Sequence, residues 1–320
     1  MLAREAKAAR EAERLDGEQR VFILNAEQVA AEVPQYGKYV AEQVARLGRN
    51  HPLVKTQYYC EEIDSQGGMF SAQRQALMQG RHSKMFSPLE DELYAILVDI
   101  AGEDEGAGGE PGIDFELANP ARDSTALTVV RVDLSTLGDE LIQAPTYQVV
   151  NRYLWTGIKH THLYGQIKAL AQLWNVRWLV VDATGVGAGM ASFLGKALPG
   201  QVIPFVFTSK SKSDLGWSFL AVVETGRYRE YQPEPEQPDL QGQFWKQVAH
   251  CQSSVDAVPG RTIRWGVPDG SRDPASGELI HDDLLISAAL CAILDKQEWG
   301  LTESGLINGV DPLAGMDPVF

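Results

Sequence analysis

A short apolar stretch that contains one acidic residue places the strongest constraint on the fold of this chain. Residues 94–100 read Tyr-Ala-Ile-Leu-Val-Asp-Ile. Such an apolar run between turn-forming residues predicts a buried strand in the centre of a sheet. Asp99 stands near the end of this strand, where an isolated ionised carboxylate is costly unless it is paired or bound to a metal. Asp99 therefore either caps a turn or holds a cation.

The composition allows a sizeable core and argues against tight binding of nucleic acid by the chain alone. The sequence has 320 residues, of which 44% are hydrophobic, and a formal net charge of -15. Affinity for nucleic acid comes mainly from Lys and Arg on phosphates. We therefore predict weak, salt-sensitive DNA binding, while a local basic patch, bound metals or a larger assembly remain compatible with DNA contact.

The cysteines and the hydropathy exclude other classes of protein. Cys60, Cys251 and Cys291 are odd in number and widely separated, and no C-x-x-C pair occurs. This argues against a structural zinc site and a disulfide framework, and it fits a reducing cytosol. No apolar run approaches the roughly 20 residues that span a bilayer, so we expect no membrane contact. Gly37-Lys38 and Gly195-Lys196 are not followed by Ser or Thr, so we predict no ATPase phosphate loop.

The order of the predicted elements indicates an α/β fold with a mixed sheet. Apolar or alternating runs predict strands, and helical spacing of apolar residues predicts helices. The first three strands follow one another through loops, which favours antiparallel pairing, whereas the later strands alternate with helices, which favours parallel pairing. The predicted strands are 94–100, 125–133, 147–155, 177–182, 202–207 and 261–266. The predicted helices are 1–15, 36–47, 70–78, 162–174, 185–198, 214–224, 240–252 and 281–296.

Acidic residues recur where these strands end or helices begin. Asp182 ends the fourth strand, Asp123 opens the second, and Asp282 and Asp283 stand at the start of the last helix. In a mixed sheet the ends of the first and fourth strands can lie side by side, and the last helix can bring a third carboxylate to them. Clustered carboxylates repel each other. Two Mg²⁺ or Mn²⁺ ions about 3.5–4 Å apart would neutralise them.

Each of these positions also has an ordinary interpretation. A strand-end Asp often caps a turn, and Asp282 or Asp283 can serve as a helix N-cap. Residues 185–189, Gly-Val-Gly-Ala-Gly, favour a tight strand-to-helix turn over a nucleotide loop. His160 and His162 favour surface or packing roles, and His281 favours contact with a ligand residue or solvent over direct metal binding.

Four segments together resemble the nuclease domain of the large terminase subunit of tailed bacteriophages. In chain order they read V-D-I-A-G-E-D (98–104), D-S-T-A-L (123–127), L-V-V-D-A-T-G-V-G (179–187) and H-D-D-L-L-I-S-A-A-L (281–290). The resemblance implies an RNase H-like fold. It also implies a metal-dependent endonuclease that cuts double-stranded concatemeric viral DNA when genome packaging starts and ends, by two-metal hydrolysis of the phosphodiester.

The resemblance also assigns expected roles to individual residues. Asp99 matches the first metal ligand, Asp182 the second, and Asp283 or Asp282 the third, with Asp99, Asp182 and Asp283 as the catalytic set. Asp123 matches an accessory acid, and His281 lies beside the acidic pair. The rival candidate for the first ligand is Asp114. Lys210 and Lys212 lie where the family has a polar, basic loop that contacts the DNA backbone.

The resemblance further predicts the domains and the partners. Residues 1–90 resemble the end of the packaging ATPase with a mostly helical linker, 91–298 form the nuclease domain, and 299–320 form a tail. The expected partners are double-stranded DNA, the packaging ATPase domain, the portal protein and the small terminase subunit. The expected location is the cytoplasm of the infected bacterium, at the procapsid portal. Two alternatives are a motor component that docks with its nuclease latent, and another RNase H-like nuclease such as a resolvase.

Overall fold

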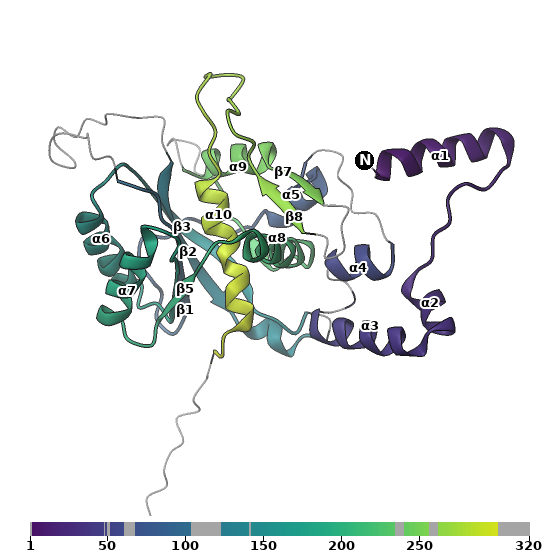
Figure 1. Cartoon of the computed structure of the whole chain (residues 1–320). Helices are drawn as coiled ribbons and strands as arrows, with labels where there is room; N and C mark the ends of the chain where they lie inside the picture. Colours follow the sequence, from purple (N-terminus) through teal and green to yellow (C-terminus); the bar gives the residue numbers. More distant parts are fainter. Residues whose placement is uncertain are drawn as a thin grey trace, which may run out of the picture.

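A six-stranded sheet forms the centre of the molecule in the computed structural model (Figure 1). The structure describes residues 2–47, 49, 52–60, 68–103, 123–140, 142–233, 240–255 and 262–299. The strand order is β5-β4-β1-β2-β3-β6. The bounds are β1 (Leu93–Asp99), β2 (Ser124–Asp133), β3 (Thr146–Thr156), β4 (Trp178–Asp182), β5 (Val202–Phe205) and β6 (Tyr228–Arg229).

The pairing of the strands confirms the predicted mixed sheet. β2 is antiparallel to both β1 and β3, whereas β4 is parallel to β1 and β5. The register places Val98 opposite Val181. The next residues of these two strands are Asp99 and Asp182, so the two carboxylates leave the sheet at the same edge, as expected for parallel neighbours.

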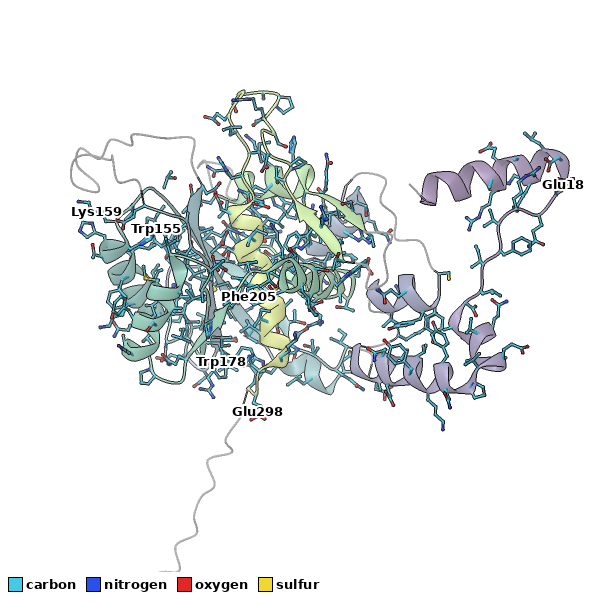
Figure 2. All side chains as sticks on the ribbon, in the orientation of Figure 1. Glu18, Trp155, Lys159, Trp178, Phe205 and Glu298 are labelled. Carbon is cyan, nitrogen blue, oxygen red and sulfur yellow. The ribbon has the colours of Figure 1, made fainter. Side chains whose placement is uncertain are left out.

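Helices cover both faces of the sheet, and β1 therefore buries side chains on both sides. Tyr94, Ile96 and Val98 join one apolar cluster, whereas Ala95 and Leu97 join the other. This explains the continuous apolar run, which is typical of a strand buried on two faces. One side carries α6 (His160–Leu173) and α7 (Gly187–Ala197), and the other carries α8 (Ser209–Glu224), α9 (Leu240–His250) and α10 (Asp283–Ala289) (Figure 1). Side chains fill the space between the layers (Figure 2).

The helices that precede the sheet divide into two groups. α1 (Leu2–Asp16) extends away from the sheet, and α2 (Ala26–Glu32), α3 (Pro34–Leu47) and α4 (Pro52–Tyr58) share a small apolar cluster (Figure 1). α5 (Ala72–Met78) instead packs on the main body, since Met69, Phe70 and Met78 belong to the core beneath the sheet. The predicted domain division at residue 90 stays a prediction.

Several element boundaries differ from the predicted ones. α8 begins at Ser209 rather than at 214, because the Thr208 side chain accepts a hydrogen bond from the Ser211 amide in a capping box. The last helix is shorter than predicted: α10 starts at Asp283, and a 3-10 helix follows it over Leu290–Lys296. A second, two-stranded sheet pairs β7 (Gln252–Val255) with β8 (Ile263–Gly266). Most of the acidic glycine-rich segment 102–112, and the predicted tail from residue 300 onward, lie outside the described residues.

Among the described helices, none combines the length and the apolar character that a membrane crossing requires.

Candidate metal centre

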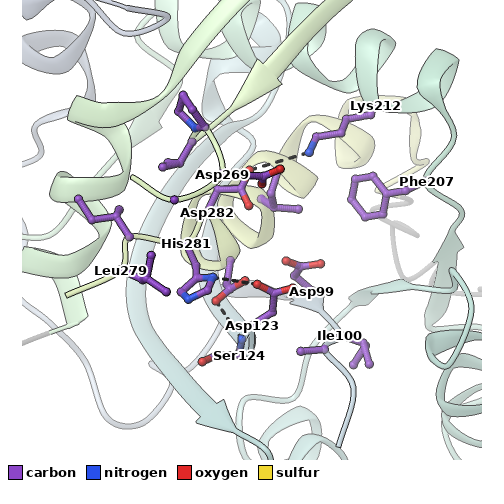
Figure 3. A pocket seen from close by; sticks show the side chains of 17 residues that line it. Asp99, Ile100, Asp123, Ser124, Phe207, Lys212, Asp269, Leu279, His281 and Asp282 are labelled. Carbon is purple, nitrogen blue, oxygen red and sulfur yellow. Dashed lines mark hydrogen bonds and ion pairs between the residues drawn. The ribbon is translucent and has the colours of Figure 1, made fainter. Parts of the chain in front are cut away.

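A pocket of about 420 Å³ opens at the edge of the sheet where β1 ends (Figure 3). It lies between the exit of β1, the start of β2, the first turns of α8 and the loop that leads into α10. Five of its lining residues are acidic, and a lysine and a histidine lie among them. These are Asp99, Asp123, Asp269, Asp282 and Asp283 together with Lys212 and His281.

Asp99 is the first candidate ligand, and its surroundings disfavour a negative charge. Burial raises the pKa of its carboxyl well above the usual range, and the nearby carboxylates of Asp283 and Asp182 raise it further. Lys212 acts in the opposite direction but is the weakest of these influences. Among the described residues, no side chain or amide donates a hydrogen bond to the Asp99 carboxylate. This is the environment that a cation would relieve.

Asp182, the second candidate, is held at the end of β4 beside Asp99. Its Oδ1 accepts a hydrogen bond from the Thr184 amide at 2.8 Å, and burial raises the pKa of the carboxyl. Asp182 does not line the pocket itself. The turn into α7 passes so close that a Cβ at Gly187 would lie 2.2 Å from the Asp182 carbonyl oxygen. The glycines after β4 therefore make the tight turn that the sequence predicted.

Asp283 is bound to the start of β2. The Ser124 amide donates to Asp283 Oδ2 at 3.0 Å. Burial nevertheless raises the pKa of Asp283 to about 7, with Asp123 and Asp282 contributing as like charges. Asp99, Asp182 and Asp283 are thus brought together from β1, β4 and α10.

Asp282 occupies the N-cap position of α10, but its side chain makes no capping hydrogen bond. Its Oδ2 lies 3.9 Å from Lys212 Nζ instead. A side chain at Gly266, where φ is +146°, would come within 2.5 Å of the same oxygen, so this glycine leaves room for the carboxylate. The capping role belongs to Gln247 of α9, whose Oε1 accepts the Leu285 amide hydrogen at 2.9 Å.

Of the accessory residues and the two lysines, Asp123, His281 and Lys212 line the pocket, whereas Lys210 does not. His281 Nδ1 lies 2.8 Å from Asp123 Oδ1 at the rim of the pocket. Lys212 reaches into the pocket, whereas Lys210 does not line it: its side chain is 82% exposed and pairs with Asp214 at 2.6 Å. Both lysines lie in the first turns of α8 and not in a loop, because the capping box starts the helix at Ser209. Asp114 lies outside the described residues.

The donor set suits a hard divalent cation. Carboxylate oxygens are the ligands that Mg²⁺ and Mn²⁺ prefer. No three His, Cys, Asp or Glu side chains in the described part of the chain form a ready-made coordination group. Such a group is not required, because Mg²⁺ in proteins commonly binds one or two carboxylates and keeps several waters. The residues therefore fit a divalent ion.

Three residues at this centre carry no recognisable sequence signal. Asp269 lines the pocket from a loop, Ser124 binds Asp283 through its backbone amide, and Gln247 caps α10 from another helix. Ser124 does lie in one of the segments that resemble the family, residues 123–127, but that segment does not indicate that its amide binds Asp283.

Comparison with known proteins shows which family this chain is similar to. Residues 118–247 match the family model described as the Terminase RNaseH-like domain. This match, with the observed sheet order, confirms the RNase H-like fold.

One curated relative and two solved structures are also similar to parts of this chain. A stretch of 81 residues, 25% of this chain, is 27% identical to "Probable terminase, ATPase subunit" of Haemophilus phage HP1, and the match spans only 13% of that relative's length. The magnesium-bound large terminase nuclease of thermophilic phage G20c has a TM-score of 0.48 at 16% identity, over 71% of this chain and 97% of that one. The Thermus phage P74-26 large terminase nuclease domain has a TM-score of 0.45 at 15% identity, over 70% and 93%. The match of residues 118–247 to the Terminase RNaseH-like domain model supports a large terminase C-terminal nuclease domain over that part of the chain.

Proposed function

We propose that this chain is a metal-dependent endonuclease that cuts double-stranded concatemeric viral DNA at the start and end of genome packaging. The terminase domain supports a packaging nuclease in general terms. The observation that carries the finer proposal is the cluster of Asp99, Asp182 and Asp283 at one sheet edge. Burial raises the pKa of all three carboxyls, and no matching set of cations accompanies them among the described residues.

In this proposal Asp99, Asp182 and Asp283 hold two Mg²⁺ or Mn²⁺ ions, with Asp282 as the alternative third ligand. Ions bound there would lower the pKa of a water nucleophile and stabilise charge on the scissile phosphate. The protein's own part is mostly positioning: Ser124 fixes Asp283, and Asp123 orients His281 at the rim. Lys212, which lines the pocket, is the proposed contact for a DNA phosphate. The G20c large terminase nuclease has been solved with magnesium, cobalt and zinc, which supports divalent ions here.

The proposed partners follow from the same assignment. Double-stranded DNA is the substrate, and the packaging ATPase domain, portal protein and small terminase subunit are the partners in packaging at the procapsid portal. The HP1 phage relative is named a terminase ATPase subunit, which supports association with a motor. The net charge of -15 supports weak DNA binding by this chain alone.

The test is nicking of supercoiled plasmid by the purified chain in Mn²⁺ and in Mg²⁺. We expect cutting that EDTA abolishes and that Asp182→Asn reduces at least about 100-fold, because the loss of a ligand weakens binding of the ions that would stabilise the developing charge. Asp214→Asn is the matched control, since it removes an exposed carboxylate that pairs with Lys210 outside the pocket. Cutting by Asp182→Asn at the rate of the unmodified chain would refute the assignment.

The same assay separates the two alternatives. A chain that binds Mn²⁺ but cuts only after a packaging ATPase is added would indicate a docking component with a latent nuclease. Preference for a four-way junction over linear duplex of the same sequence would indicate a resolvase-like enzyme.

A further inference from the structure

A buried serine connects α10 to the sheet close to the candidate metal centre. Residues 284–290 read Leu-Leu-Ile-Ser-Ala-Ala-Leu, and Ser287 is the one polar side chain among them. Its exposed fraction is 0%. The hydroxyl of Ser287 donates to the Leu97 carbonyl of β1 at 2.9 Å and is hydrogen-bonded to the Thr128 hydroxyl of β2, also at 2.9 Å. Leu97 and Thr128 are directly opposite each other in the β1–β2 register.

The three elements that meet at Ser287 each lead to a residue of the centre. Asp283 lies four residues before Ser287, about 6 Å along a helix, and Asp99 lies two residues after Leu97, about 7 Å along a strand. Ser124, four residues before Thr128, donates its amide hydrogen to Asp283 Oδ2. α10 is therefore attached to the sheet at two points, Ser287 in the core and Asp283 at the edge.

An apolar residue at position 287 would fill the space without fixing the helix along its axis. Dispersion contacts between apolar surfaces change little when a helix shifts or turns slightly, whereas hydrogen bonds need defined distances and angles. A buried hydroxyl that loses its partners is costly. Because Leu97, Thr128 and Ser287 are all fully buried, water does not replace these bonds, and the arrangement specifies one position of α10.

We propose that Ser287 is a positioning residue that, together with Thr128, holds α10 so that the Asp283 carboxylate meets Asp99 at the metal centre. This inference rests on the proposed metal-dependent function. Outer residues that orient metal ligands typically contribute roughly 10- to 100-fold to metal affinity or activity. We expect Ser287→Ala to weaken Mn²⁺ binding by about that factor and to lower kcat for plasmid nicking, while KM for DNA stays unchanged.

The experiment measures Mn²⁺ affinity of the full chain by electron paramagnetic resonance or calorimetry, with thermal unfolding recorded for every variant. Ala289→Gly is the stability-matched control, because it weakens the far end of the same helix and leaves the Ser287 hydroxyl in place. Thr128→Val removes one partner with little change of shape, and Ser287→Thr keeps the hydroxyl. The inference expects weak Mn²⁺ binding in Ser287→Ala, an intermediate loss in Thr128→Val, and binding like that of the unmodified chain in Ala289→Gly and Ser287→Thr.

The outcomes separate this inference from the proposed function. If Ser287→Ala, or Thr128→Val where Ser287→Ala does not fold, binds Mn²⁺ as the unmodified chain does, the positioning role is overturned and the nuclease stands. Equal loss of Mn²⁺ affinity in Ala289→Gly also overturns it, because any weakening of the helix would then be enough. An unmodified chain that binds no Mn²⁺ refutes the metal centre and the inference with it.

Discussion

The surroundings of Glu230 and the edge of the sheet at the end of β1 both bury acidic side chains, and they do so in opposite ways. Glu230 accepts two hydrogen bonds from Arg152, at 2.5 and 2.6 Å, and a third from the Tyr228 hydroxyl at 2.5 Å. Arg152 also lies over the ring of Phe244, with 4.0 Å between its Cζ and the ring centroid. The Glu230 carboxylate thus has its counter-charge, Arg152, inside the protein.

The pocket at the end of β1 has no such balance. Asp99 and Asp283, which line the pocket, and Asp182 beside it all have raised pKa values, and Lys212 Nζ lies 3.9 Å from the neighbouring Asp282. The comparison teaches that burial of acids alone does not indicate a site. The indication is a group of buried acids whose compensating charge has to come from outside.

The largest expected effect comes from breaking the balanced region. Arg152→Met leaves the Glu230 carboxylate buried without its cation, which typically destabilises a protein by about 3–5 kcal/mol. Urea unfolding of the full chain in EDTA measures this loss. The double variant Arg152→Met with Glu230→Gln restores much of the stability, because no charge is then left unpaired.

The same urea unfolding measurement on Asp99→Asn tests the pocket, where we expect the opposite result. Since this change removes one of several repelling charges, we expect the variant to be at least as stable as the unmodified chain without metal, although it no longer cuts DNA. A loss as large as that of Arg152→Met would show that Asp99 belongs to a paired structural network.

The second prediction concerns pH. The pKa of Asp283 is raised from 3.8 to about 7 in the fold, so the folded state holds this proton more tightly than the unfolded chain does. The stability that follows is complete below about pH 4 and is lost as the pH rises through about 7. One pKa unit corresponds to about 1.4 kcal/mol, so the loss amounts to a few kcal/mol at most.

The difference in free energy of unfolding between the unmodified chain and Asp283→Asn measures the contribution of this proton to stability. The free energy of unfolding is measured in EDTA from pH 4 to pH 8. We expect the two proteins to be similarly stable at pH 4 and the Asn variant to gain relative to the parent toward pH 8. A constant difference across this range contradicts the raised pKa.

The third prediction concerns the effect of added divalent metal ions on stability. An ion that binds only the folded state stabilises it by about 2.7 kcal/mol at 100 times its dissociation constant. Mn²⁺ or Mg²⁺ should therefore raise the melting temperature of the unmodified chain, more at pH 8 than at pH 5, where protons compete for the carboxylates. Asp99→Asn should lose most of this gain. An equal gain in both proteins would place the ions elsewhere on the molecule.

The sequence allowed the sheet to be predicted because each long strand carries its own signal. The apolar run at 94–100 predicted β1. The change from loop connections to connections through helices predicted the mixed topology, and with it the proximity of the strand ends that carry Asp99 and Asp182. β6 and β7 were missed for a physical reason. β6 has only two residues, and β7, Gln-Ser-Ser-Val, is mostly polar, so neither shows a hydrophobic period.

The parts of the centre that sequence could not provide depend on tertiary contacts. Gln247 caps α10 across 38 positions of sequence, and Ser287 binds a strand 190 positions away. Neither residue has a local pattern that distinguishes it from other polar residues. The two lysines could not be separated either, because their difference depends on where α8 begins. With 3.6 residues per turn, positions two apart point to nearly opposite sides of a helix.

The smallest predicted effect uses this pair of lysines. Lys212 reaches the pocket beside Asp282, whereas Lys210 is exposed and already paired with Asp214. A lysine that contacts a DNA phosphate releases about one counterion on binding, so its removal lowers the slope of log affinity against log salt by about 1. We expect Lys212→Ala to weaken duplex binding several-fold with this change in slope, and Lys210→Ala to change affinity by less than about twofold, as is common for exposed ion pairs.

Fluorescence anisotropy with a labelled duplex in Ca²⁺, over a series of salt concentrations, measures both quantities. The two variants lose the same charge two positions apart, so net charge cannot explain a difference between them. Equal slopes of log affinity against log salt in the two variants would mean that Lys212 does not contact a DNA phosphate and that other residues hold the duplex at the pocket. A larger loss in Lys210→Ala would place the duplex on the outer side of α8, away from the pocket. With either result, the role left for Lys212 is to pair with Asp282. The pocket would then resemble the Arg152–Glu230 region more closely, because one of its carboxylates would have a cation of the protein as its partner.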